Sequence, residues 1–149
     1  MKPPATIDSL MEEWSKDCVM DELEPGKELV RIPNLHAKYL RILSHHNLIV
    51  KKIMADYNRL KRIKWEYYSG DLNNQEDLEE YGFEPLHKKI LRQDIPTYID
   101  SDEQLNNLLI KKILHQEIVD VCTSILKELH SRTFQIKSYI EWVKYTGGA

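Results

Sequence analysis

A run of cations followed directly by aromatic residues lies near the middle of the chain, between Arg59 and Gly70. Cations neutralise the phosphates of a nucleic acid, and the flat faces of aromatic rings stack on unpaired bases. The combination therefore predicts a patch that binds a single strand, with cations on phosphates and aromatic rings on bases. The candidate contacts are the following six residues: Arg59, Lys61, Arg62, Lys64, Trp65 and Tyr68.

The same stretch has a second interpretation, as a solvated basic face of an ordinary helix. In that case Trp65 and Tyr68 pack into the core of the protein instead of facing a ligand. Helical spacing puts Lys61, Lys64 and Tyr68 on one face, because residues three and seven positions apart lie one above the other. The spacing alone leaves both interpretations open.

The charge of the chain is strongly divided along the sequence. The net charge of the 149 residues is -3, so a nucleic acid has to bind a local patch and not the protein as a whole. Residues 50–65 hold six cations and one carboxylate, a local charge of +5, whereas residues 71–84 hold six carboxylates and no cation. A basic block is thus followed by an acidic one.

Hydrophobic periodicity predicts an all-α chain built on two long helices. A Pro-Asn pair and a Ser-Gly pair mark the start and the end of the first, a basic helix over residues 35–69. The second covers residues 101–146, with Ser101 as its capping residue and two glycines behind it.

The segments outside the long helices are expected to be short and acidic. Residues 1–34 should form an acidic arm with a short helix. Residues 70–100 should form an acidic linker, mostly a loop, with a short helix over about 85–93. The whole chain, 1–149, is predicted to be a single all-α domain.

Apolar residues recur at alternating spacings of three and four along the second long helix, which is the spacing of a coiled-coil seam. One interpretation is a core inside the chain, and the other is self-association. Because 149 residues are too few to cover two helices of this length, the sequence favours a homo-oligomeric helical bundle or ring. The candidate oligomerisation residues are Val119, Cys122, Leu126, Leu129, Ile136, Ile140 and Val143.

The residue types that enzymes and metal sites need do not gather in the sequence. The five glycines form no phosphate-binding loop, and the adjacent His45 and His46 point about 100° apart on a helix. We therefore expect no catalytic residues, no cofactor and no metal site. Two cysteines, Cys18 and Cys122, suit a reducing compartment. No signal peptide or membrane segment is evident, so the expectation is a soluble intracellular protein without a membrane partner.

Two motifs resemble the UvsY family of recombination mediators from T-even-type phages. The first runs from Arg62 to Gly70, where the family carries two cations separated by one residue, an apolar residue, an acid and then Tyr-Tyr-Ser-Gly. The second is Phe134-Gln135-Ile136-Lys137, where the family carries Phe-x-Ile-Lys in a terminal helix. The order of a short acidic helix, a long basic helix, an acidic linker and a terminal helix is also similar.

The resemblance implies a function that is not enzymatic. Such mediators load a phage recombinase onto single-stranded DNA that is covered by single-strand binding protein, and they act as homo-oligomers, hexamers or heptamers. The implied partners are therefore single-stranded DNA, the recombinase, the single-strand binding protein and further copies of the chain, in the cytoplasm of an infected bacterial host. The DNA-contacting cations of the family's motif map onto Arg62 and Lys64.

This sequence departs from the family's pattern at several positions of the motif. Its two cations are exchanged in type, with Arg62 first and Lys64 second, although either attracts phosphate. Trp65 replaces a leucine and adds an aromatic surface, and Lys61 replaces an apolar residue and makes the patch more basic. The N-terminal region is also longer than in the family.

A helical scaffold or adaptor without affinity for nucleic acid is the alternative function. Its basic block would dock an acidic protein surface, for example the 71–84 segment of a neighbouring subunit. This alternative predicts oligomers that do not bind DNA. An all-α enzyme would need converging polar residues, which the sequence does not show.

Overall fold

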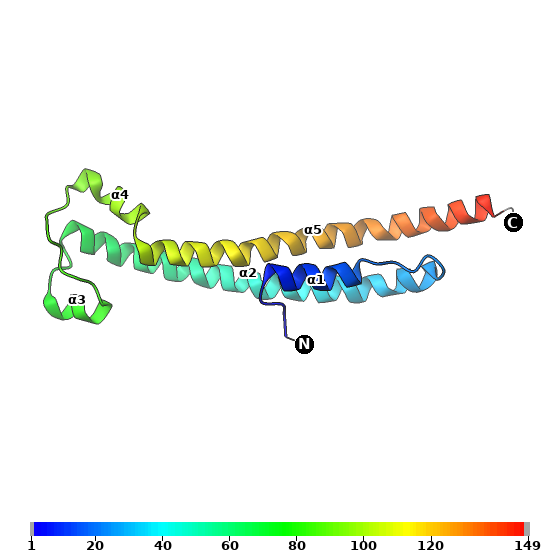
Figure 1. Ribbon diagram of the computed structural model, residues 1–149, viewed down its shortest axis with the longest axis horizontal. Helices are drawn as coiled ribbons and strands as arrows, with labels where there is room; N and C mark the ends of the chain where they lie inside the picture. Colours follow the sequence, from blue (N-terminus) through cyan, green and yellow to red (C-terminus); the bar gives the residue numbers. More distant parts are fainter. Residues whose placement is uncertain (1, 148–149) are drawn as a thin grey trace. The chain divides into compact units, whose positions relative to one another are not determined.

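The computed structural model describes residues 2–147, and these residues form helices and no β-strand. The α-helices are α1 (Ile7–Asp17), α2 (Pro25–Ser69), α3 (Gln75–Tyr81), α4 (Ile95–Asp100) and α5 (Glu103–Thr146), and a short 3-10 helix, η1, covers Arg92–Asp94 (Figure 1). The predicted all-α class with two long helices is therefore confirmed.

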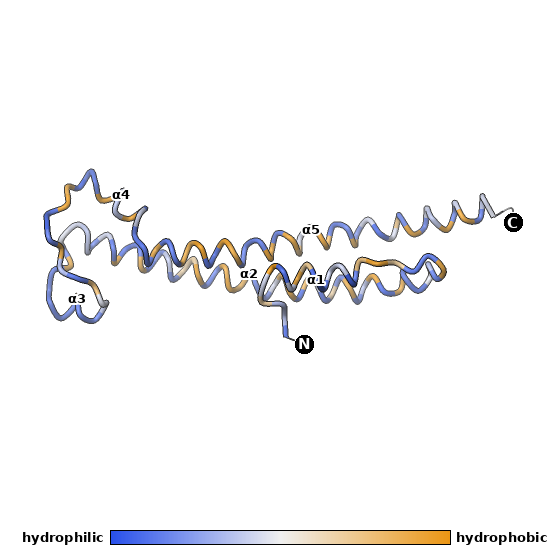
Figure 2. Tube along the Cα trace, viewed as in Figure 1, coloured by the Kyte–Doolittle hydropathy of each residue, from blue (hydrophilic) through white to orange (hydrophobic). Residues whose placement is uncertain are grey.

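The described chain divides into two compact units. The first unit holds the residues up to Ile49 together with those from Leu114 onward, and the second unit holds Val50–Ile113. Apolar positions recur between polar ones along both long helices, as the hydropathy colours in Figure 2 show. Each unit has a buried apolar cluster of its own.

α2 begins at Pro25 and not near residue 35 as predicted. Proline suits the first turn of a helix, where its missing N–H has no partner to lose, and Pro33 is carried inside the helix without its backbone hydrogen bond. The Arg31 guanidinium holds this added segment in place, because it donates to the carbonyl oxygen of Asp17 at 3.0 Å. Contacts with the end of α1 therefore override the local signal of the proline.

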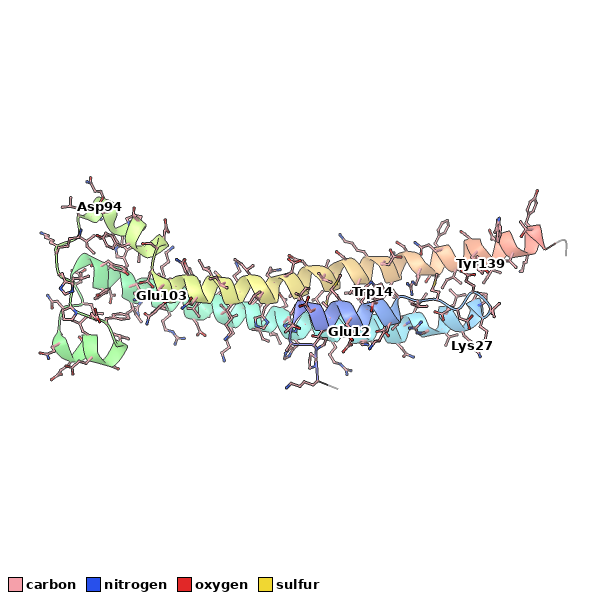
Figure 3. The ribbon with its side chains drawn as sticks, in the orientation of Figure 1. Glu12, Trp14, Lys27, Asp94, Glu103 and Tyr139 are labelled. Carbon is pink, nitrogen blue, oxygen red and sulfur yellow. The ribbon has the colours of Figure 1, made fainter. Side chains whose placement is uncertain are left out.

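The core of the first unit brings α1 against the first part of α2 and the middle of α5. Tyr39 is fully buried there, and Trp14, labelled in Figure 3, packs edge-on against it with 5.4 Å between ring centroids. Replacing a side chain that α1 contributes to this core by a smaller one would leave a cavity. α1 therefore contributes to the stability of the first unit. The buried cluster consists of Leu10, Leu35, Tyr39, Ile42, Ile118, Cys122, Ile125 and Leu129.

This core corrects part of the predicted oligomerisation seam. Cys122 and Leu129 are fully buried within a single chain, so their apolar surface is not available to a second copy. The prediction failed because α1 and α2 cover the seam, and the pattern of α5 alone does not show which helix will do so. Of the predicted residues, Val119, Cys122, Leu129 and Ile136 are buried, Leu126 and Ile140 are partly buried, and Val143 is exposed.

The terminal part of α5, by contrast, carries large apolar side chains that the described chain does not cover. Phe134 and Trp142 are 75% and 61% exposed, and Tyr145 is exposed as well. Their spacing places all three on one side of the helix. The described chain therefore leaves the apolar side chains at this end of α5 open to solvent.

A buried histidine ties the segment before α1 to the two long helices. The Nε2–H of His46 donates to the carbonyl oxygen of Pro4 at 2.7 Å, and its Nδ1 lies 2.9 Å from Nδ1 of His115. With His46 neutral, the hydrogen between the two facing nitrogens belongs to His115. Burial lowers the pKa of His46, the bond to Pro4 opposes this effect without cancelling it, and the neighbouring His45 adds to it.

We expect the first unit to lose stability when the pH falls below the ordinary histidine pKa of 6.5. Because the pKa of His46 is lower in the folded protein than in the unfolded chain, the unfolded chain binds more protons in this range and acid favours it. Free energies of unfolding from urea titrations at pH values of about 7.5 and 5.5 check this. His46→Gln should show a smaller decrease than the unchanged protein. The exposed His87→Gln is the control, and an equal decrease in all three proteins would contradict the assignment.

The linker between the long helices folds differently from the prediction. α3 occupies part of the expected loop, because the Asn74 side chain accepts a hydrogen bond from the Glu76 N–H at 3.0 Å and Gly82 ends the helix with φ at 71°. The helix expected over 85–93 does not form, and η1 and α4 follow instead. Pro96 lies in the first turn of α4, where a proline loses no hydrogen bond.

The core of the second unit joins this linker to α2 and α5. Its buried residues are Ile90, Ile95, Ile99 and Leu105, and side chains of α2 such as Tyr57 and Leu60 pack against them. α5 begins one residue after Asp102, whose Oδ1 accepts the Leu105 N–H at 2.9 Å. Asp102 therefore takes the capping role that was predicted for Ser101.

Candidate nucleic-acid interface

α2 sorts the six predicted contacts onto two sides of its last turns, all within the second unit. Leu60, Lys64 and Tyr68 follow one another at every fourth residue, which keeps them on the side that meets the core. The residues between them include partly buried side chains, such as Tyr67, and exposed ones. The exposed predicted contacts are Arg59, Lys61, Arg62 and Trp65.

These four residues, the exposed set, combine positive charge with an open aromatic ring. Lys61 and Trp65 are four residues apart and Arg62 lies between them, so an ammonium, a guanidinium and an indole share one side of the helix. Trp65 is 42% exposed. Arg59 pairs with Asp56 at 2.6 Å, but both side chains are open to solvent, where such a pair contributes little. The Arg59 guanidinium is therefore available to a phosphate.

Lys64 lies on the other side of α2, and its predicted role as a displayed phosphate contact is wrong. The side chain is buried, and its Nζ lies 3.0 Å from Oδ2 of Asp102 and 4.1 Å from the ring centroid of Phe83. The buried ammonium is thereby paired with a carboxylate and rests on an aromatic face. A phosphate would have to displace Asp102 to reach it.

Tyr68 is likewise engaged with the core, in contrast to its predicted role as a stacking surface. Its hydroxyl donates to Oδ2 of Asp102 at 2.6 Å, and its ring centroid lies 5.5 Å from that of Tyr98. Burial and the hydrogen bond to Asp102 raise the pKa of Tyr68 well above its usual range. The second interpretation of the stretch, a helix side that packs into a core, thus applies to Tyr68 and not to Trp65.

Asp102 organises this buried cluster, and sequence reasoning missed it. Its carboxylate accepts the Tyr68 hydroxyl, the Leu105 N–H and the Lys64 ammonium. Burial raises the pKa of Asp102, but these three donors outweigh that effect and hold the pKa below the ordinary value of 3.8. The carboxylate is therefore charged at neutral pH. An aspartate directly before a helix is a capping signal. The prediction placed the cap at Ser101, one position earlier, and so gave Asp102 no role.

The charge division seen in the sequence persists on the surface of the second unit. Besides the exposed set, the unit carries the exposed cations Lys51, Lys52, Lys88, Lys89, Arg92 and Lys111. The acidic segment contributes the exposed carboxylates Asp71, Glu76, Glu79, Glu80 and Glu84. Since like charges repel, a polyanion is attracted to the end of α2 and turned away from the acidic segment.

The residues that the structure describes form neither a metal-binding cluster nor a membrane-spanning helix. Among residues 2–147, no three or more His, Cys, Asp or Glu side chains gather closely enough to hold a metal ion. Over the same residues, no helix is long and apolar enough to cross a membrane. The exposed set offers charge attraction and stacking, which are binding interactions.

The sequence from residue 13 to residue 149 matches a family profile described as the recombination, repair and ssDNA binding protein UvsY. The chain belongs to the UvsY family. The match includes both motifs on which the resemblance was based, the run from Arg62 to Gly70 and the Phe-x-Ile-Lys motif near the end of α5. The resemblance drawn from the sequence is therefore confirmed.

Solved structures of UvsY, the recombination mediator protein of bacteriophage T4, share this fold. One crystal form, lattice type II, superimposes with a TM-score of 0.82 at 19% sequence identity, over 97% of this chain and 99% of that one. Lattice types IV and I each give a TM-score of 0.81 at 20% identity, over 93% of this chain and 97% and 98% of theirs. No curated protein sequence gives a match. At these identities the likeness establishes the fold of UvsY for this chain.

Proposed function

We propose that the chain is a non-enzymatic recombination mediator that binds single-stranded DNA through the exposed side of α2. The observation that carries this proposal is the exposed set, which joins three cations to an open indole in a member of a family described as ssDNA-binding. Cations on phosphates and an aromatic ring on a base are the two elements of strand binding that tolerates any sequence. In this proposal Arg62 keeps the contact role of the family motif, and Lys64 supports the helix from behind.

The affinity of one subunit comes from the release of counterions when its cations neutralise phosphates. Each neutralised phosphate makes the slope of log affinity against log salt concentration more negative by about 0.7 for a single strand. One exposed set neutralises few phosphates, so a single subunit binds weakly. When several subunits hold one strand, each further contact is made at high local concentration, and binding strengthens by roughly 10²–10⁴-fold.

The oligomer is proposed to contain six or seven subunits, as the resemblance to the family implies, joined through the terminal part of α5. Phe134 and Trp142 expose large apolar surfaces there, and removing such surfaces from water favours association. Val143, the exposed member of the predicted seam, lies in the same part of the helix. A strand bound by such an assembly touches the exposed sets of successive subunits.

The mechanism uses binding energy and needs no catalytic group or cofactor. A strand held on several exposed sets is withdrawn from the single-strand binding protein that covers it, because both compete for the same phosphates and bases. A recombinase then nucleates on the strand that has been freed. The proposed partners are therefore single-stranded DNA, the single-strand binding protein and the recombinase, all meeting in the cytoplasm of the infected host.

Loading of a recombinase onto a covered strand tests this function. A fluorescently labelled single-strand binding protein should leave the strand sooner after recombinase is added when the chain is present. The triple variant Arg59→Gln/Lys61→Gln/Arg62→Gln should leave the delay unshortened, because it lacks the phosphate contacts. The matched control, Lys16→Gln/Arg41→Gln/Lys127→Gln, removes three exposed cations of the first unit and should shorten the delay as the unchanged protein does. If the protein without substitutions does not shorten the delay relative to a reaction that lacks it, the proposal is contradicted.

A further inference from the structure

A groove in the second unit includes one residue of α2, Leu60, and one exposed cation of α5, Lys111. It has a volume of about 440 Å³ and is lined by residues of α2, of the segment around the end of α3 and of the start of α5. Leu60, which lies between Arg59 and Lys61 in the sequence, forms the apolar part of the lining together with Leu108. A groove of this size can take a small flat group from a strand that is held by the neighbouring cations.

One wall of the groove is aromatic and has a fixed support. The rings of Tyr81 and Phe83 stack with 5.5 Å between centroids and 24° between planes. Gly82 makes this arrangement possible, because its φ of 71° is one that residues with a side chain rarely adopt. Phe83 is buried beneath the Lys64 ammonium, whereas Tyr81 is 41% exposed. The wall therefore presents the exposed ring of Tyr81, which is supported from behind by the buried ring of Phe83.

The other wall of the groove is polar and comes from α5. Gln104, Asn107 and Lys111 follow at i, i+3 and i+7, so they line one side of the helix, and all three are exposed. No hydrogen bond within residues 2–147 engages either amide side chain. An amide offers a donor and an acceptor, which suits the edge of an unpaired base, and an ammonium attracts phosphate.

We propose that this groove receives one unpaired base of the bound strand, stacked on Tyr81 and hydrogen-bonded at its edge by Gln104 and Asn107. The inference rests on the proposed function, because the strand must first be held by the exposed set. Lys61 and Lys111 neutralise the phosphates next to this base. The carboxylates of α3 repel the backbone and keep it on the side of these two lysines. A subunit thus binds bases at two places, at Trp65 and in the groove.

A strand without bases tests the groove separately from the phosphate contacts. The probe is a fluorescent oligothymidylate, compared with the same strand carrying abasic sites, and the measurement is anisotropy. Stacking of one base contributes about 1–3 kcal/mol, so the unchanged protein should bind the intact strand at least about 5-fold more tightly than the abasic one. Tyr81→Leu should reduce this preference by about 5-fold, and Tyr81→Phe, which keeps the ring, should retain it.

A second variant protects the test against a local disturbance of the aromatic wall. Gln104→Ala/Asn107→Ala changes exposed helix positions and should also reduce the preference for the intact strand, while circular dichroism shows an unchanged helix content. If both variants keep the full preference, the groove takes no base and the inference is overturned, although the proposed function stands. If the unchanged protein binds neither strand, the proposed function fails and the inference fails with it.

Discussion

Replacing Lys64 by methionine should lower the free energy of unfolding by about 3–5 kcal/mol. The substitution removes the cation from a buried pair and leaves the Asp102 carboxylate charged and without its ammonium partner, which is the costly way to break such a pair. The aromatic face of Phe83 also loses the ammonium that rests on it. Urea titrations followed by circular dichroism measure the change. Arg62→Met, an exposed change of the same type, should stay within about 0.5 kcal/mol of the unchanged protein.

A double variant separates the pair from the methionine itself. Lys64→Met/Asp102→Asn removes both charges, and asparagine retains the ability to cap α5. The double variant should therefore regain part of the stability that Lys64→Met loses, giving a coupling energy of about 0.5–3 kcal/mol in the mutant cycle. If Lys64→Met were as stable as Arg62→Met and instead weakened strand binding, Lys64 would be a DNA contact and its assignment to the core would be incorrect.

The variant Phe134→Ser/Trp142→Ser should convert the proposed oligomer into monomers. Both side chains are mostly exposed in the single chain, so the change removes association surface without opening a cavity in the core. Since assembly multiplies the strand contacts, the affinity for single-stranded DNA should fall by roughly 10²–10⁴-fold although no DNA contact has been altered. Light scattering gives the mass, and anisotropy with a long oligothymidylate gives the affinity.

A matched control removes apolar side chains that are equally exposed elsewhere. Leu23→Ser/Leu91→Ser changes two exposed leucines, one in each unit, and should leave both the mass and the affinity unchanged. An oligomer of normal size from Phe134→Ser/Trp142→Ser would show that the terminal part of α5 is not the association surface. A monomer that still bound DNA at full strength would show that avidity plays no part.

The ends of the helices show how far local signals reach. The end of α2 follows from the sequence, because Gly70 adopts φ at 87° directly after Ser69, a conformation that glycine takes without strain. The start of α2 does not follow, because Pro33 is a strong local signal and the contact that overrides it joins Arg31 to the end of α1. Contacts between distant parts of the chain decide such cases, and periodicity cannot reveal them.

The candidate site divides in the same way. Arg59, Lys61, Arg62 and Trp65 are exposed, as a cation-rich helix end predicts, because nothing in the second unit demands their burial. Lys64 is buried because Asp102, far away in the sequence, needs a cation beside its capping carboxylate. Lys64 lies four residues from both Leu60 and Tyr68, and this spacing indicates the side of the helix that meets the core. The charge of the lysine favoured the opposite prediction, an exposed side chain.

The seam of α5 illustrates the same limit for packing. The alternating spacing of three and four residues correctly predicts an apolar stripe that is partly buried. The spacing does not show whether the stripe packs against helices of the same chain or against another subunit. α1 and α2 cover Cys122 and Leu129, while Phe134 and Trp142 beyond them stay exposed. Only the fold separates the part of the helix that the chain covers from the part that remains for another molecule.

The salt dependence of single-stranded DNA binding tests the central claim, that the exposed set holds the strand. The log–log slope of affinity against salt should be steep for the unchanged protein and shallower by about 2 per contacting subunit in Arg59→Gln/Lys61→Gln/Arg62→Gln, which amounts to at least about 100-fold in affinity near 0.1 M salt. The control Lys16→Gln/Arg41→Gln/Lys127→Gln should behave like the unchanged protein. Equal slopes in all three proteins would place the strand elsewhere, and no binding by the unchanged protein would favour the scaffold function instead.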